Sequence, residues 1–271
     1  MAESIDKAGE KYWTKVWKES DLAQRINVHT KSVNEYPYRI LHTFYEELFK
    51  NYKTEGKTLV EIGCGNSAFL GYFAQEFGFK VSGIDYSELG CEQSRRILQR
   101  DGIKGDILLV DAFNPPAELK EKYDFVCSFG VAEHFTDTAK TLEAFSYFLK
   151  PGGILITSVP NVVGATGFLQ KLMNKPVYDI HVPMDKPYLE EANKKAGLTL
   201  LKSRYFVSIS FAVTLEGIDG QIPFYLPKKI LLKSIRYFSK VIWIFEEMFG
   251  SLPEGKLFSA GIITAAQKPL K

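Results

Sequence analysis

The chain has 271 residues, of which 45% are hydrophobic and 24% charged, so it can form a sizeable core and is neither disordered nor of low complexity. Its 34 basic and 32 acidic residues give a formal charge of +2, without the basic surplus that drives nucleic-acid binding. Three widely spaced cysteines, Cys64, Cys91 and Cys127, argue against a disulfide framework and favour a reducing, cytoplasmic location.

The first residues, MAESIDKAGEKYW, carry charges where a signal peptide needs an apolar stretch. No run of about 18 uncharged apolar residues follows, so we expect a soluble chain without a transmembrane segment. Residues 1–56 are expected to be helical and to cap the core. Trp13 and Trp17 lie one turn apart there, and an apolar stripe follows Pro37 at Ile40, Phe44 and Leu48.

Strand and helix patterns alternate from residue 57 onward. Strand patterns cover 57–62, 79–84, 107–110, 123–129 and 154–159, and helical patterns cover 66–77, 87–100 (with Ser87 as N-cap) and 138–149. A turn is expected at 150–153, a loop at 160–184, and a helix over 187–196 that ends at Gly197. Strand patterns at 198–213 and 258–266 predict a closing antiparallel hairpin. The alternation predicts an α/β fold with a doubly wound, mostly parallel sheet of seven strands.

The residues between the two hairpin strands predict an amphipathic helix. Apolar residues recur at spacings of four and three, at Leu231, Ile235, Phe238, Ile242, Phe245 and Phe249. The other face begins with Lys228, Lys229, Lys233, Arg236 and Lys240 and ends with Glu246 and Glu247. We favour a cap helix packed on its own domain, and dimerisation or membrane-surface contact stays open. The expected division is a helical cap at 1–56, a core at 57–213 plus 258–271, and a helical insertion at 214–257.

A glycine-rich loop follows the first strand. Gly63-Cys64-Gly65-Asn66-Ser67-Ala68 fits the G-x-G-x-x-G/A pattern and opens a helix, and Asp85 follows 20 residues later. Glycine lets the backbone approach a ligand closely, and an aspartate can accept hydrogen bonds from two ribose hydroxyls. The pattern suits a dinucleotide and S-adenosylmethionine equally.

Glu61 helps to decide between these cofactors. Its carboxylate lies beside the first glycine, where a dinucleotide would place a pyrophosphate. S-adenosylmethionine has an ammonium and a sulfonium group instead, which a nearby carboxylate attracts by about 1–4 kcal/mol. An acidic neighbour of a helix N-terminus is the simpler explanation, but an unpaired charge inside an apolar strand is costly. Electrostatics therefore favour the methyl donor.

Five segments in this order, VEIGCGNSAFL, GIDYS, LLVDAF, YDFVCSFGVAEHF and LKPGGILITSVPN, resemble class I S-adenosylmethionine-dependent methyltransferases. The resemblance is greatest to small-molecule enzymes related to those of ubiquinone biosynthesis. It covers 57–161 and, more weakly, 187–198. It implies that Glu61 holds the amino end of the methionine part, which passes over Gly63, Cys64 and Gly65. It further implies that Asp85 binds the ribose, that Tyr86, Asp111, Ala112 and Phe113 surround the adenine, and that Ser128, Phe129 and Gly130 form the floor beneath the sulfonium.

Methyl transfer depends mainly on alignment of the two reactants, which can lower the barrier by about 7–11 kcal/mol, whereas a general base adds a factor of about 10²–10⁴. For a hydroxyl acceptor, His134 after the fourth strand and His181 before the late helix are the candidate bases, with structural hydrogen bonding as the alternative for each. His29 and His42 are expected to be structural or exposed, and Cys64 is not expected to be a nucleophile.

The resemblance also raises the question of a metal. Some ubiquinone-type relatives hold a divalent ion through a Glu-x-x-Glu-His pattern, but here Gly130 stands in place of the first carboxylate before Glu133 and His134, so no metal is expected. The acceptor is expected to meet aromatic cover and the loop after the fifth strand, at Tyr12, Trp13, Trp17, Tyr36 and Asn161. Such a surface suits a planar, aromatic or lipid-like small molecule, or a sugar.

The sequence thus predicts an S-adenosylmethionine-dependent methyltransferase that acts on a small molecule, preferably at a hydroxyl oxygen. N-methylation, a nicotinamide-dependent oxidoreductase and a non-catalytic cofactor-binding scaffold are the alternatives. We expect a monomer or homodimer with no nucleic-acid partner, and peripheral membrane contact stays open.

Overall fold

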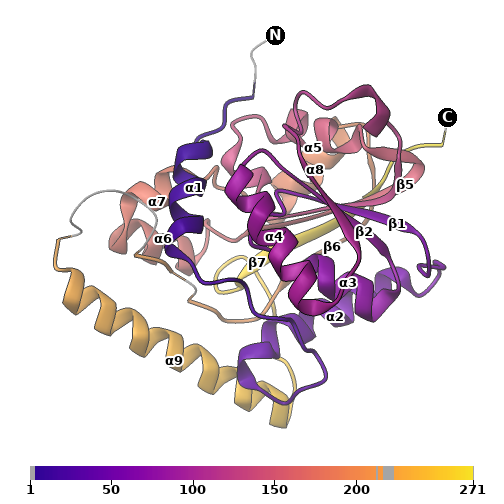
Figure 1. Ribbon diagram of the computed structural model, residues 1–271. Helices are drawn as coiled ribbons and strands as arrows, with labels where there is room; N and C mark the ends of the chain where they lie inside the picture. Colours follow the sequence, from indigo (N-terminus) through magenta and orange to yellow (C-terminus); the bar gives the residue numbers. More distant parts are fainter. Residues whose placement is uncertain (1–3, 212, 216–222, 271) are drawn as a thin grey trace.

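The computed structural model describes residues 4–211, 213–215 and 223–270. In these residues seven strands form one sheet in the order β3-β2-β1-β4-β5-β7-β6 (Figure 1). The strands are β1 (Thr58–Ile62), β2 (Lys80–Asp85), β3 (Gly105–Leu109), β4 (Tyr123–Phe129), β5 (Leu149–Pro160), β6 (Thr199–Phe206) and β7 (Gly261–Gln267). The first five pair in parallel, and β7 runs antiparallel to both β5 and β6. The predicted fold class and the closing hairpin are confirmed.

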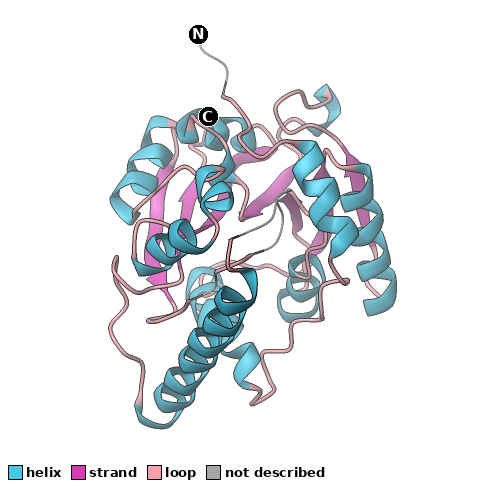
Figure 2. Cartoon of the chain, turned by 90° about the vertical axis from the view of Figure 1, so that its left-hand side faces the viewer, coloured by secondary structure: helices cyan, strands magenta, loops and turns pink. Residues whose placement is uncertain are grey.

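Helices cover both faces of the sheet (Figure 2). Alternate residues of a strand point to opposite faces, and Leu59 and Val60 of β1 accordingly belong to two different cores. The first core contains side chains of α2 (Tyr36–Phe49), α3 (Phe69–Phe77) and α4 (Glu88–Asp101). The second contains side chains of α5 (Thr138–Ser146) and α8 (Lys186–Lys195). This two-sided cover explains why the central strands are almost wholly apolar.

The ends of two helices follow the predicted signals. Ser87 caps α4, because its hydroxyl oxygen accepts a hydrogen bond from the Gly90 amide at 3.2 Å. Gly197 follows α8 with a φ of +75°, which glycine adopts without strain. The short 3₁₀ helices η1 (Val33–Glu35), η2 (Ala117–Leu119) and η3 (Ala132–His134) were not expected.

Two expectations between residues 149 and 184 were wrong. The predicted loop at 160–184 contains α6 (Ala165–Met173) and α7 (Lys175–Asp179). Gly167 suggested a loop, but the position needs glycine for packing, since a Cβ there would lie 1.7 Å from the Val162 carbonyl oxygen. The predicted turn at 150–153 lies inside β5, which begins at Leu149 and shifts register opposite Tyr123.

The amino-terminal segment is only partly helical, contrary to expectation. Between α1 (Glu10–Glu19) and η1, residues 20–32 form no helix. α1 lies beside α4, where the Trp17 carbonyl accepts a hydrogen bond from Gln93 Nε2 at 2.7 Å. α2 packs on the sheet with Phe44 and Leu48 buried, as the predicted stripe requires. α1 is therefore the part of this segment that reaches over the end of the sheet.

The insertion contains one long helix, α9 (Tyr225–Phe249), and its first part, 216–222, lies outside the described residues. The predicted apolar stripe is not the buried face, because Leu231, Phe238, Phe245 and Phe249 are exposed. A narrower stripe packs on the core instead, at Leu232, Ser239, Trp243 and Glu246. The helix packs on its own domain, as favoured, but through a different side from the predicted apolar stripe. Among the described residues, no helix is long and apolar enough to cross a bilayer.

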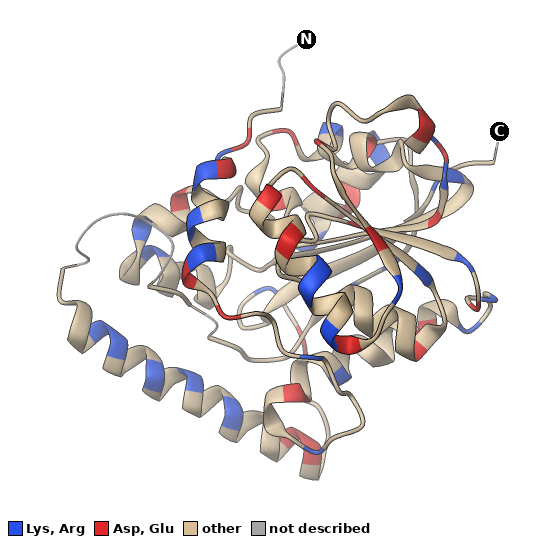
Figure 3. Cartoon of the chain, viewed as in Figure 1, with Lys and Arg blue, Asp and Glu red and all other residues tan. Residues whose placement is uncertain are grey.

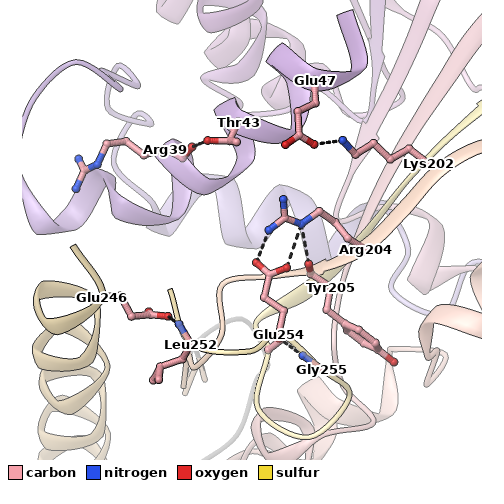
Figure 4. A network of polar contacts seen from close by, with 11 residues as sticks. Arg39, Thr43, Glu47, Lys202, Arg204, Tyr205, Glu246, Leu252, Glu254 and Gly255 are labelled. Atoms are coloured by element: carbon pink, nitrogen blue, oxygen red, sulfur yellow. Dashed lines mark hydrogen bonds and ion pairs between the residues drawn. The ribbon is translucent and has the colours of Figure 1, made fainter. Parts of the chain in front are cut away.

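The division into cap, core and insertion stays a prediction. Polar contacts tie the insertion to the core beside the end of α9 (Figure 4). The Arg204 guanidinium donates to both carboxylate oxygens of Glu254, at 3.0 and 2.7 Å, and Glu246 accepts a hydrogen bond from the Leu252 amide at 2.7 Å. Lys202 of β6 pairs with Glu47 of α2 in the same region.

Candidate active site

Two adjoining cavities lie where the carboxyl ends of β1, β2 and β4 meet α1. Their volumes are about 480 and about 460 Å³. Six residues line both cavities, which therefore share a wall: Asp6, Gly63, Asp85, Tyr86, Val131 and Phe135. Each volume lies in the range typical of small-molecule sites, at the sheet edge where open α/β folds bind ligands.

The glycine loop forms the wall of both cavities. Gly63 has a φ of +73°, and a Cβ there would lie 2.4 Å from Val131 Cγ2. At Gly65 a Cβ would lie 2.9 Å from both Asp85 Oδ2 and Trp17 Nε1. Neither position has room for a side chain, because Val131 packs against Gly63 and the side chains of Asp85 and Trp17 pack against Gly65.

Asp85 ends β2 and is held by backbone amides. Its Oδ2 accepts from the Gly65 amide at 2.8 Å, and its Oδ1 accepts from the Ser87 amide at 2.7 Å. Burial raises the pKa of Asp85, and these hydrogen bonds oppose that shift. The next residue, Tyr86, donates its hydroxyl to Asp6 at 3.0 Å. Each carboxylate oxygen of Asp85 keeps a lone pair for a further donor.

Glu61 lies in the middle of β1 and faces the larger cavity. Its side chain is almost fully buried, with 1% of the residue exposed, and its Oε2 has no hydrogen-bond partner among the described residues. Burial raises its pKa to about 8, although a hydrogen bond with Ser67 acts in the opposite direction. An empty cavity thus favours the protonated form, and a cation beside Glu61 would favour the carboxylate.

The smaller cavity forms a slot with apolar walls and four acidic side chains, those of Asp6, Glu10, Asp85 and Asp111. Asp111, Ala112 and Phe113 line it. Asp111 accepts hydrogen bonds from the Phe113 amide at 2.9 Å and from Asn114 Nδ2 at 2.7 Å. Phe113 packs on Phe135 with ring centroids 4.6 Å apart. A flat, nitrogen-rich ring suits such a slot, because it combines an apolar surface with donors at its edge.

Two predicted cofactor contacts lie apart from the cavities. Cys64 and Ser128 are fully buried and line neither, whereas Phe129 and Gly130 line the larger one. Burial raises the pKa of the Cys64 thiol well above its usual value, which leaves it unreactive. The roles of Cys64 and Ser128 therefore stay predictions.

Only part of the expected acceptor surface faces the larger cavity. Trp13 and Trp17 line it and stack at 5.2 Å. Tyr36 instead stacks on Trp243, and Asn161 Nδ2 donates to the carbonyls of Lys256 and Ser259. Tyr12, which packs against Trp13, does not line the cavity either. Tyr12, Tyr36 and Asn161 line neither cavity, so their roles in acceptor binding stay predictions.

Several residues that complete this cavity were not expected from the sequence. Tyr38 and Phe69 add aromatic surface, and their ring centroids are 6.0 Å apart. Phe69 also packs on Phe129 at 4.2 Å. Further lining residues that were missed are Gln24, Arg25, Ile26, Glu35, Asn66, Ser67, Val131 and Phe135. The aromatic residues at helical spacing resembled ordinary core, so their pattern gave no signal for a site.

His134 lines the larger cavity, and His181 lies beside it with ring centroids 4.7 Å apart. The Nδ1 of His134 is 3.1 Å from the Ile180 carbonyl, and that of His181 is 2.7 Å from the Val177 carbonyl. A carbonyl can only accept, so each Nδ1 carries the proton and each Nε2 is a free acceptor. Burial lowers the pKa of His134 to about 3, with a contribution from His181. His134 is therefore neutral in the empty cavity.

Glu133 completes a cluster with the two histidines. One ligand atom from each of Glu133, His134 and His181 lies within 4.8 Å of the others. Glu133 Oε2 is buried without a partner among the described residues, and burial raises its pKa to about 8. Two imidazole nitrogens and one carboxylate oxygen fit a divalent ion. The sequence pointed to His181 as a candidate base, but its spacing gave no sign that His181 would lie in a cluster with Glu133 and His134.

Residues 33–203 match the family model described as "Methyltransferase domain". The chain belongs to this methyltransferase family. The ubiquinone biosynthesis O-methyltransferase of Stutzerimonas stutzeri (strain A1501) is 29% identical over 154 residues, which cover 54% of this chain and 66% of that protein. The match thus spans slightly less than two thirds of that relative's length.

Solved structures of other proteins show the same fold. The geranyl diphosphate C-methyltransferase of Streptomyces coelicolor A3(2), in complex with Mg²⁺, geranyl diphosphate and S-adenosyl-L-homocysteine, has a TM-score of 0.56 and 14% identity, with 96% of each chain covered. The [4+2]-cyclase SpnF has a TM-score of 0.58 and 14% identity, with 98% of this chain and 94% of that chain covered. At 14% identity, the similarity of this methyltransferase to these two structures concerns the fold alone.

Proposed function

We propose that this protein transfers a methyl group from S-adenosylmethionine to a small molecule, preferably to a hydroxyl oxygen. The observation that supports this most directly is Glu61, a buried carboxyl group that lines the cavity beside Gly63 and whose Oε2 has no hydrogen-bond partner among the described residues. The ammonium group of the methyl donor would supply the missing partner, whereas a dinucleotide would bring a pyrophosphate. The family match also favours methyl transfer over the oxidoreductase alternative.

The two cavities divide the cofactor between them in this proposal. Glu61 binds the ammonium group, and the methionine part lies on the backbone of Gly63 and Gly65. Asp85 accepts hydrogen bonds from the ribose hydroxyls, and the slot beside Asp111 holds the adenine. The support is the order of these residues along the two adjoining cavities.

His134 is the proposed base for the acceptor hydroxyl. In the reaction, the acceptor oxygen forms a bond to the methyl carbon, the carbon–sulfur bond breaks with its electron pair going to sulfur, and the hydroxyl proton passes to Nε2 of His134. The low pKa keeps Nε2 unprotonated and ready to accept, but makes His134 a weak base. Alignment of donor and acceptor therefore contributes most of the rate, and the base contributes a smaller part.

The lining of the larger cavity favours a planar aromatic acceptor. Trp13, Trp17, Tyr38 and Phe69 offer ring faces, and a cavity of about 480 Å³ must hold part of the cofactor as well. The relative from Stutzerimonas stutzeri is an O-methyltransferase by name, which agrees with a hydroxyl acceptor. N-methylation is the remaining alternative for the same cavity.

The cluster of Glu133, His134 and His181 favours a second role for His134. A divalent ion held by these three residues would act as a Lewis acid and favour the ionised form of a nearby hydroxyl. Titration calorimetry with Mg²⁺, Mn²⁺ or Zn²⁺ on the protein and on Glu133→Gln tests this role. Loss of metal binding in the variant supports it, and no binding to either protein excludes it.

Calorimetry with S-adenosylhomocysteine and with NADH tests the proposal for the cofactor. We expect binding of the first compound, and a loss of about 1.5–3 kcal/mol of binding free energy in Asp85→Ala. The exposed Asp106 of β3 provides a matched control, since Asp106→Ala removes a carboxylate far from the cavities. Binding of NADH alone would contradict the proposal.

The transfer of labelled methyl groups from S-adenosylmethionine to a panel of phenols and amines tests the reaction itself. Product in the phenol arm supports the O-methyltransferase, and product in the amine arm alone supports the N-methyl alternative. Cofactor binding without any product across the panel would favour the scaffold alternative.

A further inference from the structure

α9 presents an apolar outer face that no other described part of the chain covers. Six large apolar side chains recur along it at helical spacing, and each has between 46% and 69% of its surface exposed: Leu226, Ile230, Tyr237, Val241, Ile244 and Met248. We call these six residues the outer face. A helix of a soluble domain normally places such residues inward, so an exposed row of this length indicates a contact surface.

A basic stripe flanks the outer face. Lys229, Lys233, Arg236 and Lys240 follow one another at spacings of four, three and four, which places them on one side of the helix. Together with Tyr225 and Tyr237 they line a shallow hollow of about 700 Å³. In Figure 3, basic residues recur along most of α9. The stripe and the outer face together form one amphipathic surface.

The carboxylates of α9 do not offset this charge. The helix has only two acidic residues, both in its last turns. Glu246 is buried and accepts a hydrogen bond from the Leu252 amide, and Glu247 pairs with Arg39 of α2. The amphipathic surface therefore has a net positive charge with no exposed, unpaired carboxylate on α9 to balance it.

The opposite side of α9 fixes its orientation. Trp243 stacks on Tyr36 at 5.8 Å and donates its Nε1 hydrogen to the Ile209 carbonyl at 2.8 Å. Leu232 packs with Met173 of α6 and Val213. Both halves of the helix are thus attached to the core, and the outer face must point away from it.

We propose that α9 lies flat on an anionic lipid bilayer, with the outer face in the boundary between headgroups and acyl chains and the basic stripe on the phosphates. A helix with this division of apolar and basic residues is typical of proteins that lie in the interface of a membrane. The inference is independent of the methyl-transfer proposal, because it rests on the surface of α9 alone.

Charge favours a membrane over a second copy of the chain. A symmetric contact between two copies would bring the outer faces together and place two basic stripes near one another. No exposed, unpaired carboxylate on α9 would compensate them. An anionic bilayer has an apolar layer that can take up the outer face, and negative charge beside it that can pair with the basic stripe.

Sedimentation with lipid vesicles tests the inference on the whole protein. We expect binding to phosphatidylcholine vesicles that contain phosphatidylglycerol, much weaker binding to phosphatidylcholine alone, and loss of binding at high salt. Since each basic residue at an anionic surface contributes roughly a fivefold gain, the triple variant Lys229→Gln, Lys233→Gln, Lys240→Gln should bind about a hundredfold more weakly.

The matched control removes the same charge elsewhere. Lys104, Lys120 and Lys194 are exposed and lie outside α9, so their replacement by glutamine should leave binding within a few-fold of the original. A second variant, Ile230→Ser, Tyr237→Ser, Met248→Ser, should lose binding to both kinds of vesicle. Circular dichroism and cofactor calorimetry show that each variant is folded.

Three results would overturn the inference. The first is no binding of the folded protein to anionic vesicles. The second is an equal loss of binding in the control and the stripe variants, because binding would then depend on total charge alone. The third is a homodimer, measured by light scattering, that the serine variant dissociates and the stripe variant does not. That result would assign the outer face to a second copy of the chain.

Discussion

The protonation of Glu61 should depend on what the cavity holds. Its pKa of about 8 in the empty cavity means that it carries a proton near neutral pH. A bound ammonium group would stabilise the carboxylate and release that proton. Below pH 8, part of the binding free energy is therefore used to remove the proton.

This gives a first prediction, on the pH dependence of cofactor binding. The affinity for S-adenosylhomocysteine should rise between about pH 6 and about pH 8, by at most about tenfold per pH unit, and then level off. In Glu61→Gln, which keeps the shape but not the charge, affinity should fall at least tenfold at high pH and lose this slope. Calorimetry in buffers of different ionisation enthalpy measures the released proton. If the affinity of Glu61→Gln depends on pH as that of the original protein does, Glu61 does not bind the ligand.

A second prediction concerns the histidines. His134→Gln should lower kcat by about 10²–10⁴ while the affinity for S-adenosylhomocysteine stays within a few-fold, because the imidazole acts on the acceptor. His181→Gln should have a smaller effect on kcat, since His181 does not line the cavity. His29→Gln is the control, because His29 is exposed and pairs with Glu76. If all three variants have the same kcat, alignment alone accounts for the rate.

At the level of elements, α1 and the glycine loop close the cavity together. Trp17 Nε1 is buried without a partner among the described residues and lies within 2.9 Å of where a Cβ on Gly65 would stand. The close approach of α1 to the loop is thus possible only because position 65 has no side chain.

The third prediction follows from this close approach. Gly65→Ala should displace Asp85 or Trp17, lower the free energy of unfolding by about 1–3 kcal/mol, and weaken cofactor binding. Gly255→Ala is the control, since a Cβ there meets no atom within 4 Å. Urea denaturation and calorimetry measure the two effects. Equal behaviour of the two variants would show that α1 moves freely above the loop.

Local patterns predicted the sheet well because each strand and helix of the core follows its own period. Ser87 and Gly197 marked helix ends correctly, and the glycine loop with Asp85 predicted the part of the site that lies on consecutive strands. The contacts of Tyr36 with Trp243 and of Asn161 with Lys256 depend on segments far apart in the sequence. No local spacing contains that information, so the sequence could not predict that these two side chains lie away from the cavities.

The α9 helix shows the same limit in another way. Its apolar residues cover more than one side, so periodicity identified a helix but not which side is buried. The side that packs contains Ser239 and Glu246, which sequence reasoning would place outward. Which side of α9 is buried depends on its contacts with Tyr36 and Ile209 of the core.

Considered as a whole, the empty protein keeps two carboxyl groups, Glu61 and Glu133, buried and protonated. Burial raises both pKa values from 4.5 to about 8. Between these values each of the two carboxyl groups binds more protons in the folded state than in the unfolded state, which lowers stability as the pH rises. The pKa of His134 is lowered to about 3, so His134 acts in the opposite direction below about pH 6.5.

The fourth prediction is a decline in the free energy of unfolding of the ligand-free protein between about pH 6.5 and about pH 8, above the range in which His134 opposes the two carboxyl groups. Glu133→Gln should make this decline less steep, because an amide does not titrate. Glu143→Gln, a change at an exposed carboxylate on α5, should leave the slope as it is. Urea denaturation at several pH values measures it. If Glu133→Gln has the same pH dependence of the free energy of unfolding as the original protein, ionisation of Glu133 does not destabilise the fold.

The position of β7 has a consequence for the order in which the newly made chain can assemble. Among the described residues β6 pairs with β7 alone, and β7 follows α9 in the chain. Until β7 has been made, β6 has no neighbour in the sheet, whereas the residues of α9 already exist. A lipid surface could meet α9 before the sheet is complete, so membrane attachment and the final step of folding would proceed together.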